Sequence, residues 1–492
     1  MKKIVVLIGA VAIFATANGQ YTSDALKYSQ NFPAITARSL GMGGAFTSLG
    51  GDFSSVLYNP AGLGLYRKSE IVITPSLNYS SSKSDYLGQS NSDFRYQFNL
   101  GSLGYVGNYT MNREKGLVSA SFAAGYVRQN SFNNYTYIRG TNPNNSLSDY
   151  FMGNAEGNDP ETLDAFYERL AFDSYIIDTV PGTAYNYQTP VLLPTDQRKT
   201  IDTRGGIGTW SIAAGLNFSN IFYVGMGIGI PQLTYDRTAV HTEFDTDPNH
   251  DFSSFLFTED LRVDGTGFAM NFGAMLRVMN IMRIGGALQL PTYFKIHEHY
   301  YNTLSSDFKN GDHYDAVPTD QNGDKLAEGN FAYKLYTPMK AQGGLSIQIG
   351  QMGIISTDVE FVDYGNLHLS ESDNYNDLSG SNQDIKKVYK SVVNFKMGGE
   401  IRFNNLSVRL GGGYYPSPCS SIQSPDIYTY IGTVPSSYKE VSTGLGYRNK
   451  NFFFDLGFSG LFHKEKYNLY FENVSNLDKV QYRMLATMGF RF

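Results

Sequence analysis

The sequence predicts an all-β protein: a 14-stranded antiparallel transmembrane β-barrel with an N-terminal hatch (plug) inside its lumen. Three observations indicate this class: strands with one apolar and one polar face, connections that alternate between short and long, and a distinctive composition. Charged residues make up only 17% of the 492 residues, aromatic residues reach 14%, and there are 51 glycines. Low charge with abundant Tyr and Phe is typical of barrels that face lipid and carry aromatic girdles.

Composition also excludes two classes. A net charge of -6 argues against a nucleic-acid-binding protein, which needs a basic surface. Beyond residue 20 no apolar run is long enough to cross a membrane as a helix.

Residues 1–19 read as a signal peptide. Lys2 and Lys3 precede an apolar core, Ile4 to Phe14, and small residues up to Gly19 follow it. We expect cleavage after Gly19. Position 20 is Gln and not Cys, so we expect no lipoprotein anchor. The signal peptide itself predicts that the protein is exported.

Residues 20–68 lack the alternation of strands, and we expect them to form the hatch. Ser23-Asp24 can cap a short helix that ends before Pro33, and Asp52 can cap another that ends at Asn59-Pro60. The segment between these helices is rich in glycine, which permits tight turns and close contact with a barrel wall.

Residues 69–492 supply the predicted barrel, and Gln481 to Phe492 show the pattern most clearly. One face carries Tyr482, Met484, Ala486, Met488, Phe490 and Phe492, and the other carries Gln481, Arg483, Leu485, Thr487, Gly489 and Arg491. A strand separates these sets, whereas a helix would mix them. About fourteen such stretches follow one another. Mid-strand charges such as Lys396, Glu400 and Asp455 must face inward, because a lipid-facing charge costs roughly 2–4 kcal/mol.

The connections between strands alternate in length. Short turns are expected at positions such as Ser219-Asn220, Gly350-Gln351 and Asn404-Asn405, and long polar segments lie between them, the largest at 130–206. This sorting is typical of the outer membrane of a Gram-negative bacterium, with the short turns in the periplasm.

Two of the long segments carry apolar residues. Asp159-Pro160-Glu161 predicts a helix start, and the helix would place Leu163, Phe166, Tyr167 and Leu170 on one face. The segment 237–260 adds Phe252, Phe255, Leu256 and Phe257. These residues either pack against their own loops or border an extracellular groove for apolar ligands; both interpretations stay open.

Candidate chemistry is sparse. His297 and His299 share one strand face, a spacing that a metal or haem could use, although a solvated rim is the commoner explanation. Cys419 is the only cysteine, lies in a Pro-rich segment and is expected to be an inert thiol. No hydrolase, nucleotide-binding or metalloprotease motif appears, so we expect no enzyme and no cofactor.

The hatch also carries a family resemblance. Arg38-Ser-Leu-Gly-Met-Gly-Gly-Ala45, followed by Leu57-Tyr-Asn-Pro-Ala-Gly-Leu63, resembles the N-terminal hatch of the FadL/TodX outer-membrane transporters of long-chain fatty acids and hydrocarbons. The resemblance implies passive uptake of hydrophobic compounds through a pocket beside the hatch. On this basis Asn59, Pro60 and Ala61 are candidate ligand-binding residues, with Phe53, Leu57 and Tyr58 as possible lining. Asn59-Pro60 could equally be a helix stop.

The resemblance further implies a lateral exit at a kink in the third strand, here about Leu117 to Gln129. Candidate gate residues are Phe122, Gly125 and Tyr126. Gly125 marks either a bulge or a place where the hatch packs closely.

The expected partners are outer-membrane lipid and lipopolysaccharide, a hydrophobic small-molecule ligand, and the barrel-assembly machinery during biogenesis, with no nucleic acid and a monomeric state. A rival function comes from relatives that serve type IX secretion by carrying or anchoring protein cargo. A third, haem uptake, depends on His297 and His299 alone.

Overall fold

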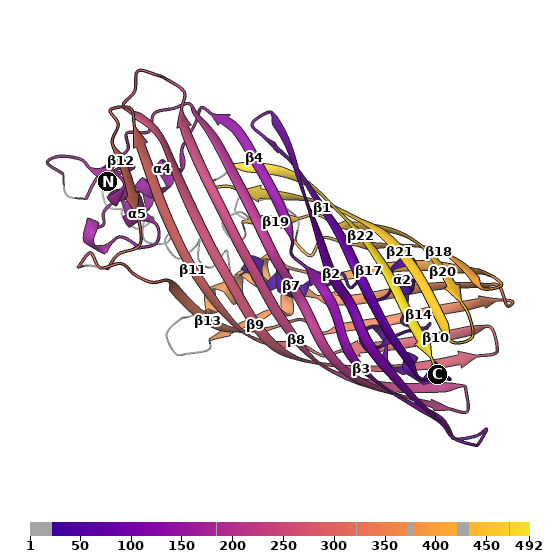
Figure 1. The fold of residues 1–492 in the computed structure, drawn as a ribbon. Coiled ribbons are helices and arrows are strands. Elements are labelled where there is room, and N and C mark those ends of the chain that lie inside the picture. The colour runs from indigo at the N-terminus through magenta and orange to yellow at the C-terminus, as the bar shows by residue number, and fades with distance from the viewer. Residues whose placement is uncertain (1–21, 184, 321, 372–377, 421–431, 472) are drawn as a thin grey trace.

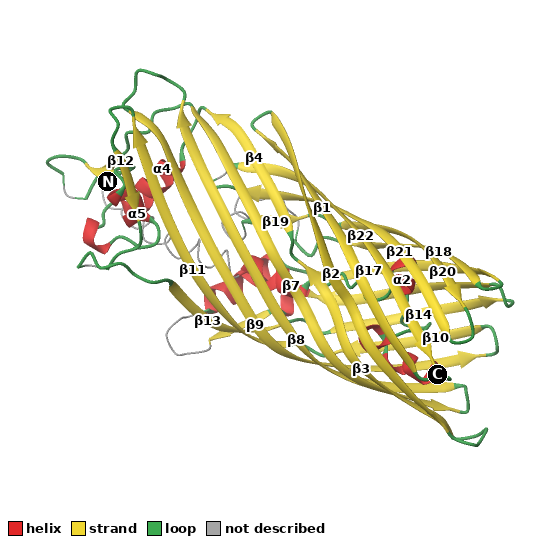
Figure 2. Ribbon diagram, viewed as in Figure 1, coloured by secondary structure: helices red, strands yellow, loops and turns green. Residues whose placement is uncertain are grey.

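The computed structural model describes residues 22–183, 185–320, 322–371, 378–420, 432–471 and 473–492. The predicted signal peptide, residues 1–19, lies outside these ranges. Figures 1 and 2 show one antiparallel sheet closed into a barrel whose strands are inclined to its axis. Strand β1 pairs with β22 from Glu70–Arg491 to Asp85–Asn476, so the sheet closes on itself and these two strands are not free edges.

The wall comprises these described strands: β1 (Glu70–Tyr86), β2 (Gln89–Thr110), β3 (Leu117–Ser131), β4 (Asn134–Asn142), β7 (Thr195–Phe218), β8 (Phe222–Asp245), β9 (Phe252–Val278), β10 (Met282–Gln289), β11 (Tyr293–Phe308), β13 (Gly329–Tyr336), β14 (Lys340–Ile349), β15 (Gly353–Asp363), β16 (His368–Glu371), β17 (Ser391–Phe403), β18 (Leu406–Tyr415), β19 (Thr433–Pro435), β20 (Tyr438–Arg448), β21 (Phe452–Asn468) and β22 (Val474–Arg491). The pairs β3–β4, β10–β11, β13–β14, β15–β16 and β19–β20 are each one interrupted passage through the wall. The barrel therefore has 14 strands, which confirms the predicted fold class.

The remaining elements are short. They are α2 (Ala37–Gly41), α3 (Ser55–Tyr58), η1 (Pro60–Leu65), α4 (Leu147–Ala155), η2 (Pro160–Thr162), α5 (Glu168–Asp173), η3 (Tyr364–Asn366), α6 (Ser379–Val388), and the strands β5 (Asp178–Thr179), β6 (Tyr187–Gln188) and β12 (His313–Ala316). Residues 22–29 are also helical. In the part of the chain that the structure describes, no helix combines the length and apolarity that a membrane crossing requires.

The outer surface carries an apolar belt and the interior is polar. Ile284, Phe395 and Leu445 are 47%, 46% and 59% exposed, whereas the inward Lys396, Glu400 and Asp455 are buried. The predicted inward orientation of these three charged residues is therefore confirmed. A lipid-facing apolar band around a polar interior is the arrangement of a bacterial outer-membrane barrel, and the protein belongs in the outer membrane of a Gram-negative bacterium.

The two ends of the barrel differ as predicted, but the long segments hold more strand than expected. β7, β8 and β9 contain 24, 24 and 27 residues and extend toward the upper left in Figure 1. The predicted loops 130–206 and 237–260 are therefore wrong in extent, since β4 and parts of β7, β8 and β9 occupy much of them. Above the apolar belt, the outward face of a strand meets water. Outward residues such as Thr234 and Thr238 are polar there. The sequence of these strand ends therefore resembles that of a polar loop.

Residues 22–68, here called the lumenal segment, lie inside the barrel. Helix α2 contacts β20, β21 and β22, and η1 contacts β7, β8 and β9. Contacts with strands from opposite parts of the sheet mean that this segment fills the lower lumen. Thr36 caps α2 by accepting a hydrogen bond from the Ser39 amide, and the Ser39 hydroxyl accepts one from the Thr36 amide in return.

Candidate functional site

The Asn59-Pro60-Ala61 sequence forms the start of helix η1. Asn59 has extended backbone, its Oδ1 accepts a hydrogen bond from the Ala61 amide at 3.0 Å, and Pro60 occupies the first helical position. Asn59 Nδ2 donates to the Thr47 carbonyl at 2.6 Å, with longer contacts of 3.3 Å to the carbonyls of Ala274 and Gly286 in the wall. One side chain therefore caps a helix, joins two parts of the lumenal segment and reaches the barrel.

A glycine patch in the wall accommodates this turn. Gly215, Gly225 and Gly273 lie in register on β7, β8 and β9. A Cβ atom on Gly273 would lie 1.8 Å from Asn59 Oδ1, and one on Gly225 would lie 2.3 Å from the Pro60 carbonyl carbon. The backbones approach each other more closely than any larger residue at these positions would permit.

Phe53 uses a second glycine pair. A Cβ atom on Gly104 would lie 2.2 Å from the Phe53 ring, and one on Gly125 would lie 2.8 Å from it, and these two glycines face each other on β2 and β3. Gly125 thus lies where the lumenal segment packs closely. The register irregularities of β3 fall between Leu117 and Ser119 and between Arg128 and Asn130 instead.

Buried charges also connect the lumenal segment to the wall. Arg38 Nε lies 2.9 Å from Glu400, and Glu400 lies 2.7 Å from Arg409, whose side chain is fully buried. Arg409 in turn lies 2.6 Å from Asp455. Each carboxylate is paired, as charges removed from water must be.

A cavity of about 960 Å³ lies between the lumenal segment and the extracellular loops. Its floor includes Asp24, Leu26, Lys27 and Phe32. None of the six predicted hatch residues (Phe53, Leu57, Tyr58, Asn59, Pro60 and Ala61) lines this cavity; all except the partly buried Leu57 are buried below it. Sequence reasoning missed the floor, because the capping signal at Ser23-Asp24 predicts a helix without saying which way its side chains point.

The cavity lining combines paired charges with aromatic rings. Lys27 lies 2.6 Å from Asp24, and Lys199 lies 3.2 Å from Glu259. The aromatic lining comes from Tyr150, Phe151, Tyr167, Phe257 and Tyr467 among others. Pairing reduces the net field inside, so the rings can present apolar surface to a ligand.

The predicted extracellular helix is wrong as a continuous element. Asp159 caps it as expected, accepting from the Glu161 amide at 3.0 Å, but η2 ends at Thr162 and Leu163 is extended. Helix α5 starts afresh at Glu168, and α4 was not predicted. Leu163 turns inward and joins an apolar cluster. A single helical turn is only marginally stable, so burying Leu163 is favoured over continuing the helix.

The predicted groove residues mostly pack among themselves. Leu163, Leu170, Phe252, Phe255 and Phe257 belong to one buried cluster, and the Phe166 ring lies edge-on to Tyr300 at 4.9 Å. Of these, Phe257 also lines the cavity. The cluster includes Leu147 and Phe151 of α4, which also line the cavity. Figure 1 shows α4 and α5 at the end of the barrel away from the short turns.

The backbone pairing between β2 and β3 ends partway up the wall, and the unpaired stretch above this point is here called the separation. The two strands pair from Thr110–Ser119 up to Ser102–Val127. Above this point β2 pairs with β1 and the continuing β3 pairs with β7. β4 lies against the inner face of β1, where Thr136 Oγ1 donates to Ser82 at 3.1 Å.

Side chains span this separation. Ser131 Oγ donates to Gln97 Oε1 at 3.3 Å, and Arg95 forms an ion pair with Asp202 on β7. The cavity lining includes the adjacent corner, Asn130 to Asn134. The predicted gate residues Phe122 and Tyr126 lie lower on β3, with Phe122 exposed to lipid and Tyr126 against Trp210.

His297 and His299 lie on β11 next to β9 and β13. His299 Nδ1 lies 3.1 Å from Glu328. Within the described ranges, no group of three or more His, Cys, Asp or Glu side chains is arranged to hold a metal ion.

Comparison with known proteins defines the fold. No family model matches the chain, and no curated protein matches it. Among solved structures, a FadL homologue from Pseudomonas aeruginosa is similar with a TM-score of 0.54 and 12% identity, covering 94% of this chain and 99% of its own. The toluene transporter TodX from P. putida gives 0.53 and 11%, and the toluene transporter TbuX from Ralstonia pickettii gives 0.50 and 14%, each with the same coverage. The chain therefore has the FadL/TodX fold, as the resemblance in its N-terminal segment implied.

Proposed function

We propose that this protein takes up hydrophobic compounds, long-chain fatty acids or hydrocarbons, across the outer membrane by passive diffusion. In this proposal residues 20–68 act as a plug, the cavity above it holds the ligand, and the ligand leaves sideways between β2 and β3 into the bilayer. The observation that carries the proposal is the separation of β2 from β3 beside the cavity corner at Asn130 to Asn134.

The lateral route follows from what surrounds the cavity. Below it the lumenal segment is buried against the wall, with Asn59 and Arg38 bonded to barrel residues. On the outer side of the separation β2 presents Phe94, Tyr96 and Phe98, which are 55%, 64% and 75% exposed. An apolar ligand gains about 25 cal/mol for each Å² kept from water, so passage into lipid is favoured over release into the periplasm.

The plug residues then have a positioning role. Asn59, Pro60 and Ala61 hold the plug against the glycine patch, and the ligand contacts come from Leu26, Phe32 and the aromatic lining above. Lipid, lipopolysaccharide and the barrel-assembly machinery are the remaining proposed partners of a monomeric barrel. No enzymatic step forms part of the proposal.

Bridging the separation tests the proposal. Gln97→Cys and Ser131→Cys are introduced together and joined with a reducible bis-methanethiosulfonate reagent. Uptake of radiolabelled oleate and toluene is measured in cells that lack other transporters for these compounds. We expect uptake to fall at least tenfold on bridging and to return on reduction.

The matched control bridges Ile284→Cys and Leu345→Cys, which face each other on the paired strands β10 and β14. This bridge should leave uptake unchanged. Uptake unaffected by the Gln97–Ser131 bridge would contradict lateral exit, and a protein that increases uptake of neither compound would contradict the transport function itself.

A further inference from the structure

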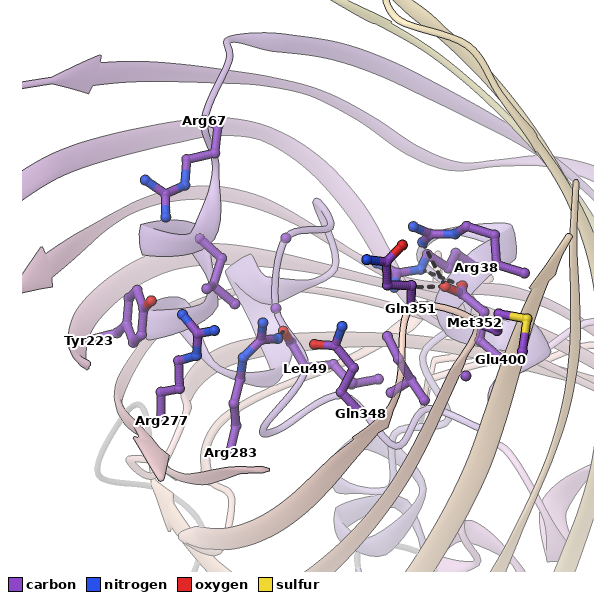
Figure 3. A pocket seen from close by; sticks show the side chains of 16 residues that line it. Arg38, Leu49, Arg67, Tyr223, Arg277, Arg283, Gln348, Gln351, Met352 and Glu400 are labelled. Atoms are coloured by element: carbon purple, nitrogen blue, oxygen red, sulfur yellow. Dashed lines mark hydrogen bonds and ion pairs between the residues drawn. The ribbon is translucent and has the colours of Figure 1, made fainter. Parts of the chain in front are cut away.

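A second pocket, of about 340 Å³, opens at the end of the barrel that carries the short turns. Five arginines line it: Arg38 and Arg67 from the lumenal segment, Arg277 from β9, Arg283 from β10 and Arg402 from β17. Figure 3 shows Arg277 and Arg283 side by side, near Tyr223 and Gln348, with Arg67 set apart from them on the same side of the pocket. This pocket is separate from the cavity of the proposed uptake route.

The carboxylate in the lining is already engaged. Among the described residues that line the pocket, Glu400 is the one acidic residue, and it lies within ion-pairing distance of Arg38 (2.9 Å), Arg409 (2.7 Å) and Arg402 (3.1 Å). It therefore contributes little negative charge to the opposite side of the pocket.

The arginines on that opposite side have neutral partners. Arg67 Nη2 donates to Asn220 Oδ1 at 2.7 Å, and Arg283 Nη1 donates to the Leu49 carbonyl at 3.2 Å. Among the described residues, no carboxylate lies within 4.0 Å of the guanidinium nitrogens of Arg67, Arg277 or Arg283.

The register makes this arrangement unfavourable without an anion. Arg277 and Arg283 are directly opposite each other on β9 and β10. Like charges at directly opposed positions destabilise a strand pair. Both residues are partly buried, so water screens their repulsion less than it would on an open surface.

We propose that this pocket binds a phosphate group. Guanidinium forks donate parallel hydrogen bonds to phosphate oxygens. A tetrahedral phosphate directs its terminal oxygens, three in a monoester and two in a phosphodiester headgroup, toward separate forks, whereas the two oxygens of a carboxylate lie in one plane. The Tyr223 hydroxyl and the Gln348 amide supply further donors. The phosphate belongs either to a soluble ester at this mouth or to a phospholipid headgroup of the inner leaflet.

A bound phosphate would also connect the wall to the lumenal segment. Arg283 holds the Leu49 carbonyl, and Gly50 and Gly51 line the same pocket. Binding should therefore stabilise the lumenal segment as well as relieve the Arg277–Arg283 repulsion.

The test uses the purified full-length barrel. Pyrophosphate and inorganic phosphate are titrated at constant ionic strength while the heat of binding and the unfolding temperature are followed. Retention of phosphatidylglycerol is measured by native mass spectrometry after extraction from nanodiscs. The variants are Arg277→Gln and Arg283→Lys, which keeps the charge and loses the fork. The control is Arg113→Gln, at an exposed turn at the same end and outside the pocket.

The expected result is saturable binding that weakens at least tenfold in both pocket variants and is unchanged in Arg113→Gln. Without phosphate, Arg277→Gln should unfold at a higher temperature than the wild type. Binding of the soluble anions identifies a soluble ester, and loss of phosphatidylglycerol retention in the pocket variants identifies a headgroup. Equal behaviour of all variants, or no binding of any probe by the folded wild type, would overturn the proposal.

Discussion

Replacing Gly273 with Ala should loosen the lumenal segment without altering the barrel. The new Cβ atom would lie 1.8 Å from Asn59 Oδ1, far inside van der Waals contact, and the nearby wall is backbone that cannot yield. Asn59 must therefore move. We expect the turn at Asn59-Pro60 to separate from the glycine patch on β7, β8 and β9.

The magnitude follows from the hydrogen bonds that Asn59 makes. Displacement breaks its bonds to the Thr47 carbonyl and from the Ala61 amide, both buried. A buried hydrogen bond contributes about 0.5–1.5 kcal/mol net, so the cost is about 1–3 kcal/mol. Local opening should then increase about 5- to 150-fold.

Hydrogen exchange of the backbone amides of Asn59 and of residues 61–66 measures this opening directly. Gly286→Ala is the matched control, because its Cβ atom would meet its nearest neighbour at 3.9 Å. In the Asn59→Ala background, Gly273→Ala should cost much less than in the wild type, since the clash with the Asn59 side chain is then absent and Pro60 Cδ, at 3.1 Å, is the one tight contact left among the three nearest atoms. Exchange in Gly273→Ala that equals exchange in Gly286→Ala would refute the reasoning.

Three further predictions concern the belt, the thiol and the loops. Ile284→Arg places a charge in the lipid-facing belt and should cost roughly 2–4 kcal/mol of folding free energy in vesicles, whereas Thr234→Arg, above the belt, should cost little; equal urea midpoints would contradict the assigned belt. Burial raises the pKa of the Cys419 thiol to about 11, and the residue is 2% exposed, so maleimide at pH 7 should label the unfolded chain and not the folded one. Burial also raises the pKa of the Glu168 carboxyl above its ordinary value of 4.5, so its ionisation opposes loop folding as pH rises from 4.5 through the raised value. Glu168→Gln should therefore make the loops more protease-resistant than the wild type at pH 8 and have no effect at pH 4. Loops that are less resistant in Glu168→Gln than in the wild type at pH 8 would show that the ionised carboxylate stabilises them.

The barrel could be predicted because its pattern has a direct physical cause. Lipid on one side and a polar lumen on the other force residues such as Met484 outward and Arg483 inward along β22. The resulting alternation of apolar and polar residues is visible in one strand's sequence, without knowledge of its partner strands. The same logic placed Lys396, Glu400 and Asp455 inside. It failed above the belt, where the outward face of β8 and β9 meets water and carries polar residues such as Thr234, while Leu233 and Tyr235 are buried inside. The apolar face is there the inner one, the reverse of the pattern in the belt.

The candidate site was less predictable because it depends on register. Gly215, Gly225 and Gly273 form one patch only when β7, β8 and β9 pair as they do, and glycine is common throughout this chain. Arg277 and Arg283 become neighbours by the same pairing. The Asn-Pro-Ala sequence identified the right segment, but its contacts are with the wall and with other parts of the lumenal segment.

Photolabelling would test the lateral route most directly. The barrel in proteoliposomes is illuminated with a diazirine-bearing long-chain fatty acid, and the labelled residues are mapped by mass spectrometry with and without excess oleate. The account predicts oleate-sensitive labelling at Phe132 in the cavity corner and along β2 from Phe94 to Phe98. The yield there should exceed the yield at Phe395 on the closed wall. Labelling at the β2–β3 separation that matches Phe395 and does not respond to oleate would contradict it.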